Sequence, residues 1–178
     1  MNRDTIEIMG LTFAVTFDYD QDIGAPWDWS DCHGPVRIGR NHADGQSDKR
    51  PGERPLNCAG WRENQYYYDW QEACRMARRD GWNAVPFDAP DRAHRAVQAD
   101  FDYLSGWVNG EWHYVVVGVC QVDEDGAEIG DWDWIGGVET CRDYHHEMAR
   151  EMAEEMARRI IRESKERAYW ESRDVETV

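Results

Sequence analysis

Cysteine and histidine side chains occur in two parts of the sequence where a zinc ion could bind. Cys141 and His145 are four residues apart, so they would share one face of a helix, and His146 follows directly. The second group is more scattered and consists of Cys32, His33, His42 and Cys58. Zinc sites usually take ligands from closely spaced pairs, and the sequence contains no CxxC pair. We therefore predict no metal and no cofactor, and we interpret the five cysteines as reduced thiols.

Carboxylates are numerous enough for general acid–base catalysis. Asp131 and Asp133 would share one face of a strand, as a glycosidase pair might, but Trp132 and Trp134 would then lie on the opposite face. The sequence also lacks a phosphate-binding loop, an HExxH zinc motif and a GxSxG nucleophile motif. We predict no catalytic residue and keep one enzymatic alternative, a small metal-dependent hydrolase that uses the loop 20–60.

The tripeptide Trp-Asp-Trp occurs twice, at 27–29 and at 132–134, and each copy lies in an acidic segment. The net charge is −16, and most of it falls in residues 1–35, with seven acids against one arginine, and 111–141, with eight acids and no basic residue. Aromatic faces attract guanidinium and ammonium groups, and carboxylates form charge-assisted hydrogen bonds with them. The pattern therefore favours a surface for an arginine- and lysine-rich partner. Its predicted residues are Trp27, Asp28, Trp29, Asp31, Asp123, Glu124, Asp125, Glu128, Asp131 and Asp133.

Two alternatives limit this interpretation. The acids could serve only to keep the protein soluble. The tryptophans could be core residues whose neighbouring aspartates face water, as strand alternation allows. Direct binding to nucleic acid is not expected, because it needs a basic patch and only the stretch from Arg37 to Arg54 is mildly positive. A membrane partner is not expected either, because the longest apolar run, near Tyr114 to Cys120, is far shorter than the roughly 18 residues of a spanning helix.

The elements that would position these residues form an α+β fold in a single domain, 1–178. A small antiparallel sheet would combine an N-terminal strand, alternating from Thr5 to Tyr19, with a later hairpin. The hairpin strands are predicted at 112–122 and 127–138, around a turn at 123–126. A long irregular loop, rich in glycine and proline, is predicted at about 20–64, with one short strand near 36–38.

Three helices would pack on this sheet. The first is predicted at about 70–80, with Asp69 as its N-cap and Gly81 as its stop, and the second runs from near Pro90 to Asn109. The third is long, about 142–171, and its methionine–alanine repeat every four residues predicts a core face. Its polar end is predicted to project from the fold.

Several stretches resemble a family of small phage-encoded proteins of unassigned function. They are Gly24 to Trp27, His33 to Val36, Asp48 to Arg54, and Tyr67 to Trp82. The resemblance covers most of the chain and implies expression in the cytoplasm of a bacterial host, but it brings no catalytic residues to transfer. Small acidic phage proteins often look like inhibitors of host defence, and some imitate the charge of DNA.

The hypothesis is thus a non-enzymatic, acidic phage protein that binds and inhibits a basic host protein. The expected partner is a nucleic-acid-binding complex, such as a CRISPR effector or a restriction enzyme, blocked by DNA mimicry. Besides the hydrolase, the other alternative is a phage accessory protein that self-associates as a homodimer through the C-terminal helix.

Overall fold

The chain forms two compact units. Unit 1 comprises Met1–Gln21 and His113–Val178, and unit 2 comprises Asp22–Trp112. The computed structural model describes residues 3–40, 47–58, 64–82 and 91–174. Each unit contains an antiparallel sheet packed by helices, which confirms the predicted α+β class. That the two units form a single domain stays a prediction.

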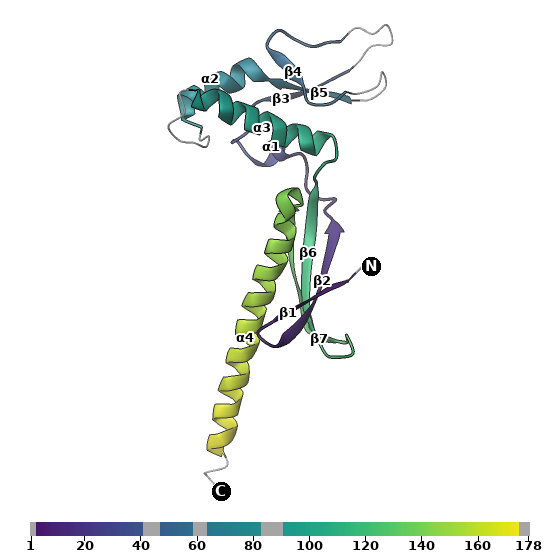
Figure 1. Cartoon of the computed structure of the whole chain (residues 1–178), viewed down its shortest axis with the longest axis vertical. Helices are drawn as coiled ribbons and strands as arrows, with labels where there is room; N and C mark the ends of the chain where they lie inside the picture. Colours follow the sequence, from purple (N-terminus) through teal and green to yellow (C-terminus); the bar gives the residue numbers. More distant parts are fainter. Residues whose placement is uncertain (1–2, 41–46, 59–63, 83–90, 175–178) are drawn as a thin grey trace. The chain divides into compact units, whose positions relative to one another are not determined.

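Unit 1 is a four-stranded antiparallel sheet with one long helix along it (Figure 1). Its strand order is β1-β2-β6-β7, with β1 at Asp4–Ile8, β2 at Leu11–Tyr19, β6 at Tyr114–Val122 and β7 at Glu128–Glu139. A short 3-10 helix, η1 at Cys141–Asp143, leads into α4 at Tyr144–Asp174. The β6–β7 hairpin and α4 confirm the hairpin and the long C-terminal helix that the sequence predicts.

The N-terminal part differs from the prediction in one respect, because two strands stand where one was expected. β1 and β2 pair in an antiparallel hairpin, with Ile8 opposite Leu11. The turn is Met9-Gly10, and both residues have positive φ, 55° and 78°. The apolar residues move from even positions in β1, such as Ile6, to odd positions in β2, such as Phe13. A two-residue turn produces this change of parity, whereas a continuous strand would keep one parity.

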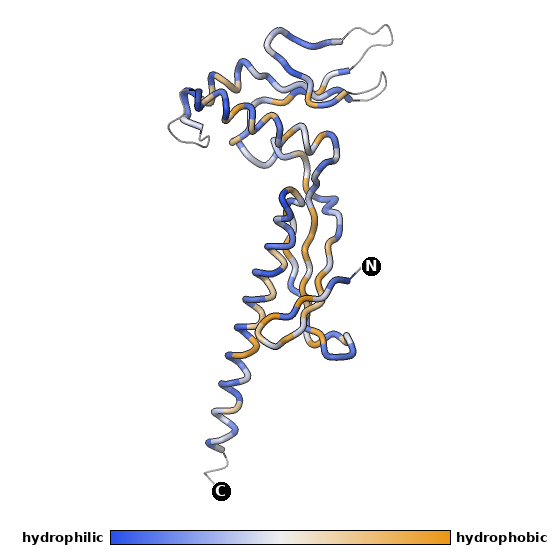
Figure 2. Tube along the Cα trace, viewed as in Figure 1, coloured by the Kyte–Doolittle hydropathy of each residue, from blue (hydrophilic) through white to orange (hydrophobic). Residues whose placement is uncertain are grey.

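The core of unit 1 lies between this sheet and α4. Phe13 and Val15 of β2 and Val117 and Val119 of β6 are almost completely buried. They belong to one cluster with the small residues of α4, namely Ala149, Ala153 and Ala157, and with Met156. The apolar course of β6 is visible in Figure 2. The methionine–alanine repeat is therefore a core face, as predicted, because alanines every four residues let the helix approach the sheet.

The last turns of α4 have no such packing. From Arg162 to Arg173 every side chain is exposed, including Tyr169 and Trp170. In Figure 1 this end of α4 extends past the sheet of unit 1. Self-association through this segment stays a prediction.

Unit 2 contains a three-stranded antiparallel sheet of order β3-β5-β4. Its elements are α1 at Pro26–Trp29, β3 at Val36–Arg40, β4 at Glu53–Pro55, β5 at Asn64–Asp69, α2 at Trp70–Asp80 and α3 at Arg92–Val108. The segment 20–64, expected to be an irregular loop, therefore holds two outer strands of a sheet, of which β3 matches the predicted short strand. Among the residues that the structure describes, both strands pair only with β5.

The helices of unit 2 agree closely with the sequence pattern. The N–H of Glu72 donates to the Asp69 carboxylate at 2.9 Å, and Gly81 ends α2 in the left-handed conformation with φ 68°. The predicted start of the next helix at Pro90 lies outside the described residues, and its end at Asn109 is confirmed. The second core includes Leu56, Tyr68, Trp70, Ala73, Ala77, Val97 and Leu104.

Candidate functional site

The tip of the β6–β7 hairpin carries three of the predicted acids. Gly126 closes the turn with φ 81°, and its N–H donates to the carbonyl oxygen of Asp123 at 3.0 Å. The carboxylate of Asp123 accepts the backbone N–H groups of Asp125 and Ala127 at 3.0 and 2.8 Å. Asp123 therefore shapes the turn. Glu124 and Asp125 are exposed, and neither forms an ion pair with any residue that the structure describes.

Three further predicted acids lie on β7. Glu128 forms an ion pair with Arg3 at 2.8 Å, and Asp133 forms one with Arg159 of α4 at 3.0 Å. Exposed pairs of this kind contribute at most about 1 kcal/mol, but they neutralise charge locally. Asp131 is exposed and has no ion pair within the described ranges. The arginine pairs thus leave fewer uncompensated carboxylates on the hairpin than the sequence suggests.

The tryptophans of β7 form a stacked pair on one face of the sheet. The ring centroids of Trp132 and Trp134 are 5.3 Å apart, with an interplanar angle of 25°. Trp134 lies over Gly118 of β6, where a Cβ atom would collide with the indole. Asp133 points to the opposite face, where it meets Arg159. The two residue types therefore lie on opposite faces, as strand alternation predicts.

Large apolar side chains remain exposed beside the acids of β7. Ile129, Trp134 and Ile135 are 46%, 50% and 39% exposed. Within the described residues β7 is an edge strand of its sheet. We use the name hairpin surface for the exposed set Glu124, Asp125, Ile129, Asp131, Trp134 and Ile135. An edge strand with apolar and acidic side chains is suited to contact with another protein.

The other predicted binding residues belong to unit 2, so the ten residues are divided between the two units. Trp27 is packed rather than presented, with ring centroids 5.7 Å from Tyr66 and 5.2 Å from Trp107. The Asp28 carboxylate accepts a backbone N–H just before α1 at 3.3 Å. Trp29, by contrast, is 65% exposed. Trp27 packs against the core of unit 2, whereas Trp29 is exposed, and that either residue binds a partner stays a prediction.

Asp31 is exposed and lines a pocket of about 460 Å³ within unit 2. The other lining residues are Cys32, Asp80, Trp82, Ala96 and Asp100.

The basic stretch that could have favoured nucleic acid is occupied by internal contacts. The Arg37 guanidinium donates to both carboxylate oxygens of Glu53, at 2.9 and 2.8 Å, and to Asp48 at 3.1 Å. The guanidinium of Arg54 lies 3.3 Å from the centroid of the Trp70 ring. These contacts weaken the case for direct phosphate binding through this stretch.

The Arg37–Glu53 pair makes stability depend on pH. The Arg37 guanidinium beside Glu53 lowers the pKa of this buried carboxyl in the folded chain. A lowered pKa contributes stability above the unfolded value of about 4.3, and this contribution is lost as the pH falls through the folded pKa. We expect Glu53→Gln to cost about 2–4 kcal/mol at pH 7 and progressively less below pH ~4.3. Urea unfolding of both proteins across this pH range measures it, and a gap that does not narrow in acid would contradict the assignment.

A polar cluster that the sequence analysis missed lies in unit 2, around Asp100 of α3. One oxygen of its carboxylate is 2.6 Å from Nδ1 of His33. The other accepts the N–H of Gly34 at 2.8 Å and the hydroxyl of Tyr68 at 2.7 Å. Burial, together with the Asp100 charge, raises the pKa of Tyr68. The His33 ring stacks on Tyr103, with centroids 5.4 Å apart. Because His33 and Asp100 are 67 positions apart in the sequence, no local sequence pattern indicates this contact.

The potential metal ligands at the start of α4 differ from those that the sequence suggests. Burial raises the pKa of Cys141 to about 11, and the hydrogen bond that its thiol donates to the Glu139 carboxylate at 3.0 Å acts in the same direction. Asp143 takes its place beside His145 and His146. Burial and the neighbouring His146 lower the pKa of His145, and His113 acts in the same direction. Of the second group, His42 lies outside the described residues, and Cys32, His33 and Cys58 join no metal-like cluster within them.

Comparison with known proteins gives no relative: no family model, curated protein or solved structure matches the chain. Within the described residues, no helix combines the length and apolar character needed to cross a membrane.

Proposed function

We propose that the chain is a non-enzymatic binding protein whose hairpin surface docks on a basic protein. The observation that carries this proposal is the combination of exposed acids that have no ion pair among the described residues with an exposed indole. Glu124 and Asp125 lie in the hairpin turn, and Asp131 lies on the edge strand β7 together with Trp134. Carboxylates steer a basic partner towards the hairpin, and the indole supplies apolar contact and a cation–π partner for arginine.

The partner class in this proposal is a nucleic-acid-binding protein of a bacterial host. Such proteins carry the basic surfaces that an acidic hairpin attracts, and a net charge of −16 disfavours direct contact with nucleic acid. Occupation of a nucleic-acid channel by carboxylates would inhibit the partner by mimicry of DNA. The phage origin and the role against host defence belong to the same proposal and rest on the sequence resemblance.

The test is a comparison of two baits. The triple variant Glu124→Gln, Asp125→Asn and Asp131→Asn removes three charges from the hairpin surface and touches no described ion pair. We expect a nucleic-acid-binding protein to be captured from bacterial lysate by the wild type, to be lost from the variant, and to be released by salt or by duplex DNA. The purified pair should then lose roughly 10-fold or more in affinity, because each close charge pair is worth about 1–2 kcal/mol.

A matched control neutralises acids elsewhere in unit 1. Glu163→Gln with Glu166→Gln removes two exposed charges from the last turns of α4 and should leave the purified complex almost unchanged. Equal binding by the wild type and the hairpin variant would contradict the proposal, as would a complex that DNA does not displace.

A further inference from the structure

Three side chains of types that commonly ligate metals lie close together at the start of α4. One ligand atom from each of Asp143, His145 and His146 lies within 4.8 Å of the other two. The two histidines belong to the first turn of α4, and Asp143 ends η1 with a positive φ of 60°. Aspartate adopts this left-handed conformation more readily than most residues do, and the Asp143 carboxylate lies next to the two imidazoles.

The His145 ring has a nitrogen whose hydrogen-bonding capacity is unused. Its Nδ1 atom is shielded from solvent and has no hydrogen-bond partner among the described residues. Buried polar atoms in folded proteins are nearly always satisfied, and an ion or a bound water is a common explanation when no protein group does so. His145 belongs to the cluster just described, and its unpartnered nitrogen is an observation independent of the spacing of the ligand atoms.

Phe17 of β2 holds both rings in place. Its ring centroid is 4.9 Å from that of His145 and 4.9 Å from that of His146, with steep interplanar angles of 74° and 78°. The centroids of the two imidazoles are only 4.1 Å apart. Phe17 therefore keeps the two imidazoles side by side at the start of α4.

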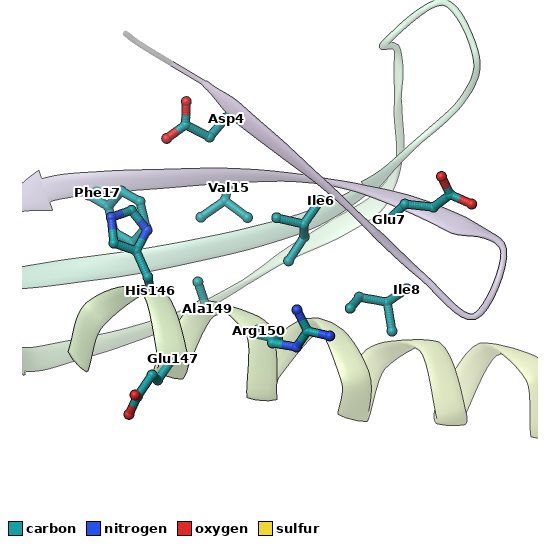
Figure 3. A pocket seen from close by; sticks show the side chains of 10 residues that line it. All are labelled: Asp4, Ile6, Glu7, Ile8, Val15, Phe17, His146, Glu147, Ala149 and Arg150. Carbon is teal, nitrogen blue, oxygen red and sulfur yellow. The ribbon is translucent and has the colours of Figure 1, made fainter. Parts of the chain in front are cut away.

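The cluster is also accessible. Figure 3 shows the His146 ring against Phe17, in a groove of about 480 Å³ between β1, β2 and the start of α4. Asp4 and Glu7 lie on the rim of this groove, and Arg150 projects from α4. His146 therefore belongs both to the cluster and to a pocket that an ion and small ligands can reach.

We propose that Asp143, His145 and His146 bind one divalent transition-metal ion, for which Zn²⁺ is the best match. Two imidazoles and a carboxylate are ordinary zinc ligands, with bonds of about 2.0–2.2 Å and ligand atoms roughly 3.3–3.5 Å apart. Asp143 and His146 are exposed, so their side chains can rotate to close the remaining distance. Three protein ligands leave a coordination position open to water or to a donor group from a partner. The site is independent of the hairpin surface.

Equilibrium dialysis of the full chain against Zn²⁺ tests the site. The wild type should bind one zinc ion more than the double variant His145→Ala/His146→Ala. Asp143→Asn should weaken the site by about 10–100-fold or more, the loss that even an outer-shell partner of a metal causes. The control is His94→Ala, which removes an exposed histidine from α3 of unit 2 and should bind zinc like the wild type.

Co²⁺ used as a spectroscopic probe separates this site from the five thiols of the chain. The predicted ligands contain nitrogen and oxygen only, so the cobalt spectrum of the site should lack a thiolate charge-transfer band. Far-ultraviolet circular dichroism checks the fold of each variant, and the exposed Asp143→Asn provides the comparison if the double variant unfolds. Equal zinc stoichiometry and affinity in the wild type and a folded variant would overturn the proposal, and so would a cobalt site that cysteine alkylation abolishes.

Discussion

Asp100→Ala is expected to lower the free energy of unfolding of unit 2 by about 3–5 kcal/mol, because it removes the acceptor of three donors at once. The imidazole of His33, the N–H of Gly34 and the hydroxyl of Tyr68 all bond to this carboxylate, and the Tyr68 side chain is completely buried. Each would keep its desolvation cost without its partner. Hydrogen exchange at the amides of β5 and α3 measures the effect, and their exchange should accelerate by roughly 10²–10³-fold.

Two variants at neighbouring positions make this prediction specific. Asp102→Ala removes an exposed carboxylate from the same helix, where it only accepts from Gln98, and should change stability by less than about 0.5 kcal/mol. Asp100→Asn should lose less than Asp100→Ala, since its amide oxygen still accepts from Tyr68 and Gly34 while its NH₂ group donates to a neutral His33. An Asp100→Ala protein as stable as Asp102→Ala would show that the cluster does not hold unit 2 together.

This cluster illustrates what the sequence could not predict. The sequence identified His33 only as one of several scattered metal ligands, because its partner Asp100 is remote and sits in an ordinary helix. The sequence predicts β3 shorter than it is and does not predict β4. Within the described ranges both strands pair only with the more distant β5, and β4 has three residues. Neither strand has a run of alternating apolar and polar residues long enough to predict a strand of its full length.

Local signals, by contrast, predicted the elements correctly. The Asp69 N-cap and the Gly81 stop set the ends of α2, and the Asp-Gly turn set the β6–β7 hairpin. No local sequence signal indicates the separation into two units. The strands β2 and β6 pair with each other although all of unit 2 lies between them in the sequence. This is also why the ten predicted binding residues, chosen by composition, fall into two separate sets.

The sequence predicts that the acids of the β6–β7 hairpin are exposed, but it does not predict the ion pairs of Glu128 and Asp133. Arg3 reaches Glu128, and Arg159 reaches Asp133, from sequence positions far outside the acidic segment. A charge count over 111–141 therefore overestimates the negative field of the hairpin. The parity change from Ile6 and Ile8 to Leu11 is the sequence signal of the Met9-Gly10 turn.

Phe13→Ala is expected to destabilise unit 1 by about 3–5 kcal/mol, as removal of a buried phenylalanine typically does. Phe13 is fully buried in β2 and shares a core cluster with Val117 of β6 and with Ala153 and Ala157 of α4. Alanines cannot extend to fill the space that the missing ring leaves, so the cavity term should be near its upper range. Urea unfolding, with hydrogen exchange at the amides of β2 and β6, measures the loss.

The matched control for Phe13→Ala is Tyr19→Ala on the same strand, where the ring is 63% exposed and the expected cost is below about 1 kcal/mol. Equal losses at the two positions would mean that β2 is not the core strand of unit 1. The comparison also separates stability from recognition, since Phe13→Ala leaves the charges of the hairpin surface intact. For Phe13→Ala, binding of a basic partner should therefore fall only in proportion to the folded fraction, at every salt concentration. The neutralised hairpin variant should lose affinity although it is fully folded, and the loss should be largest at low salt.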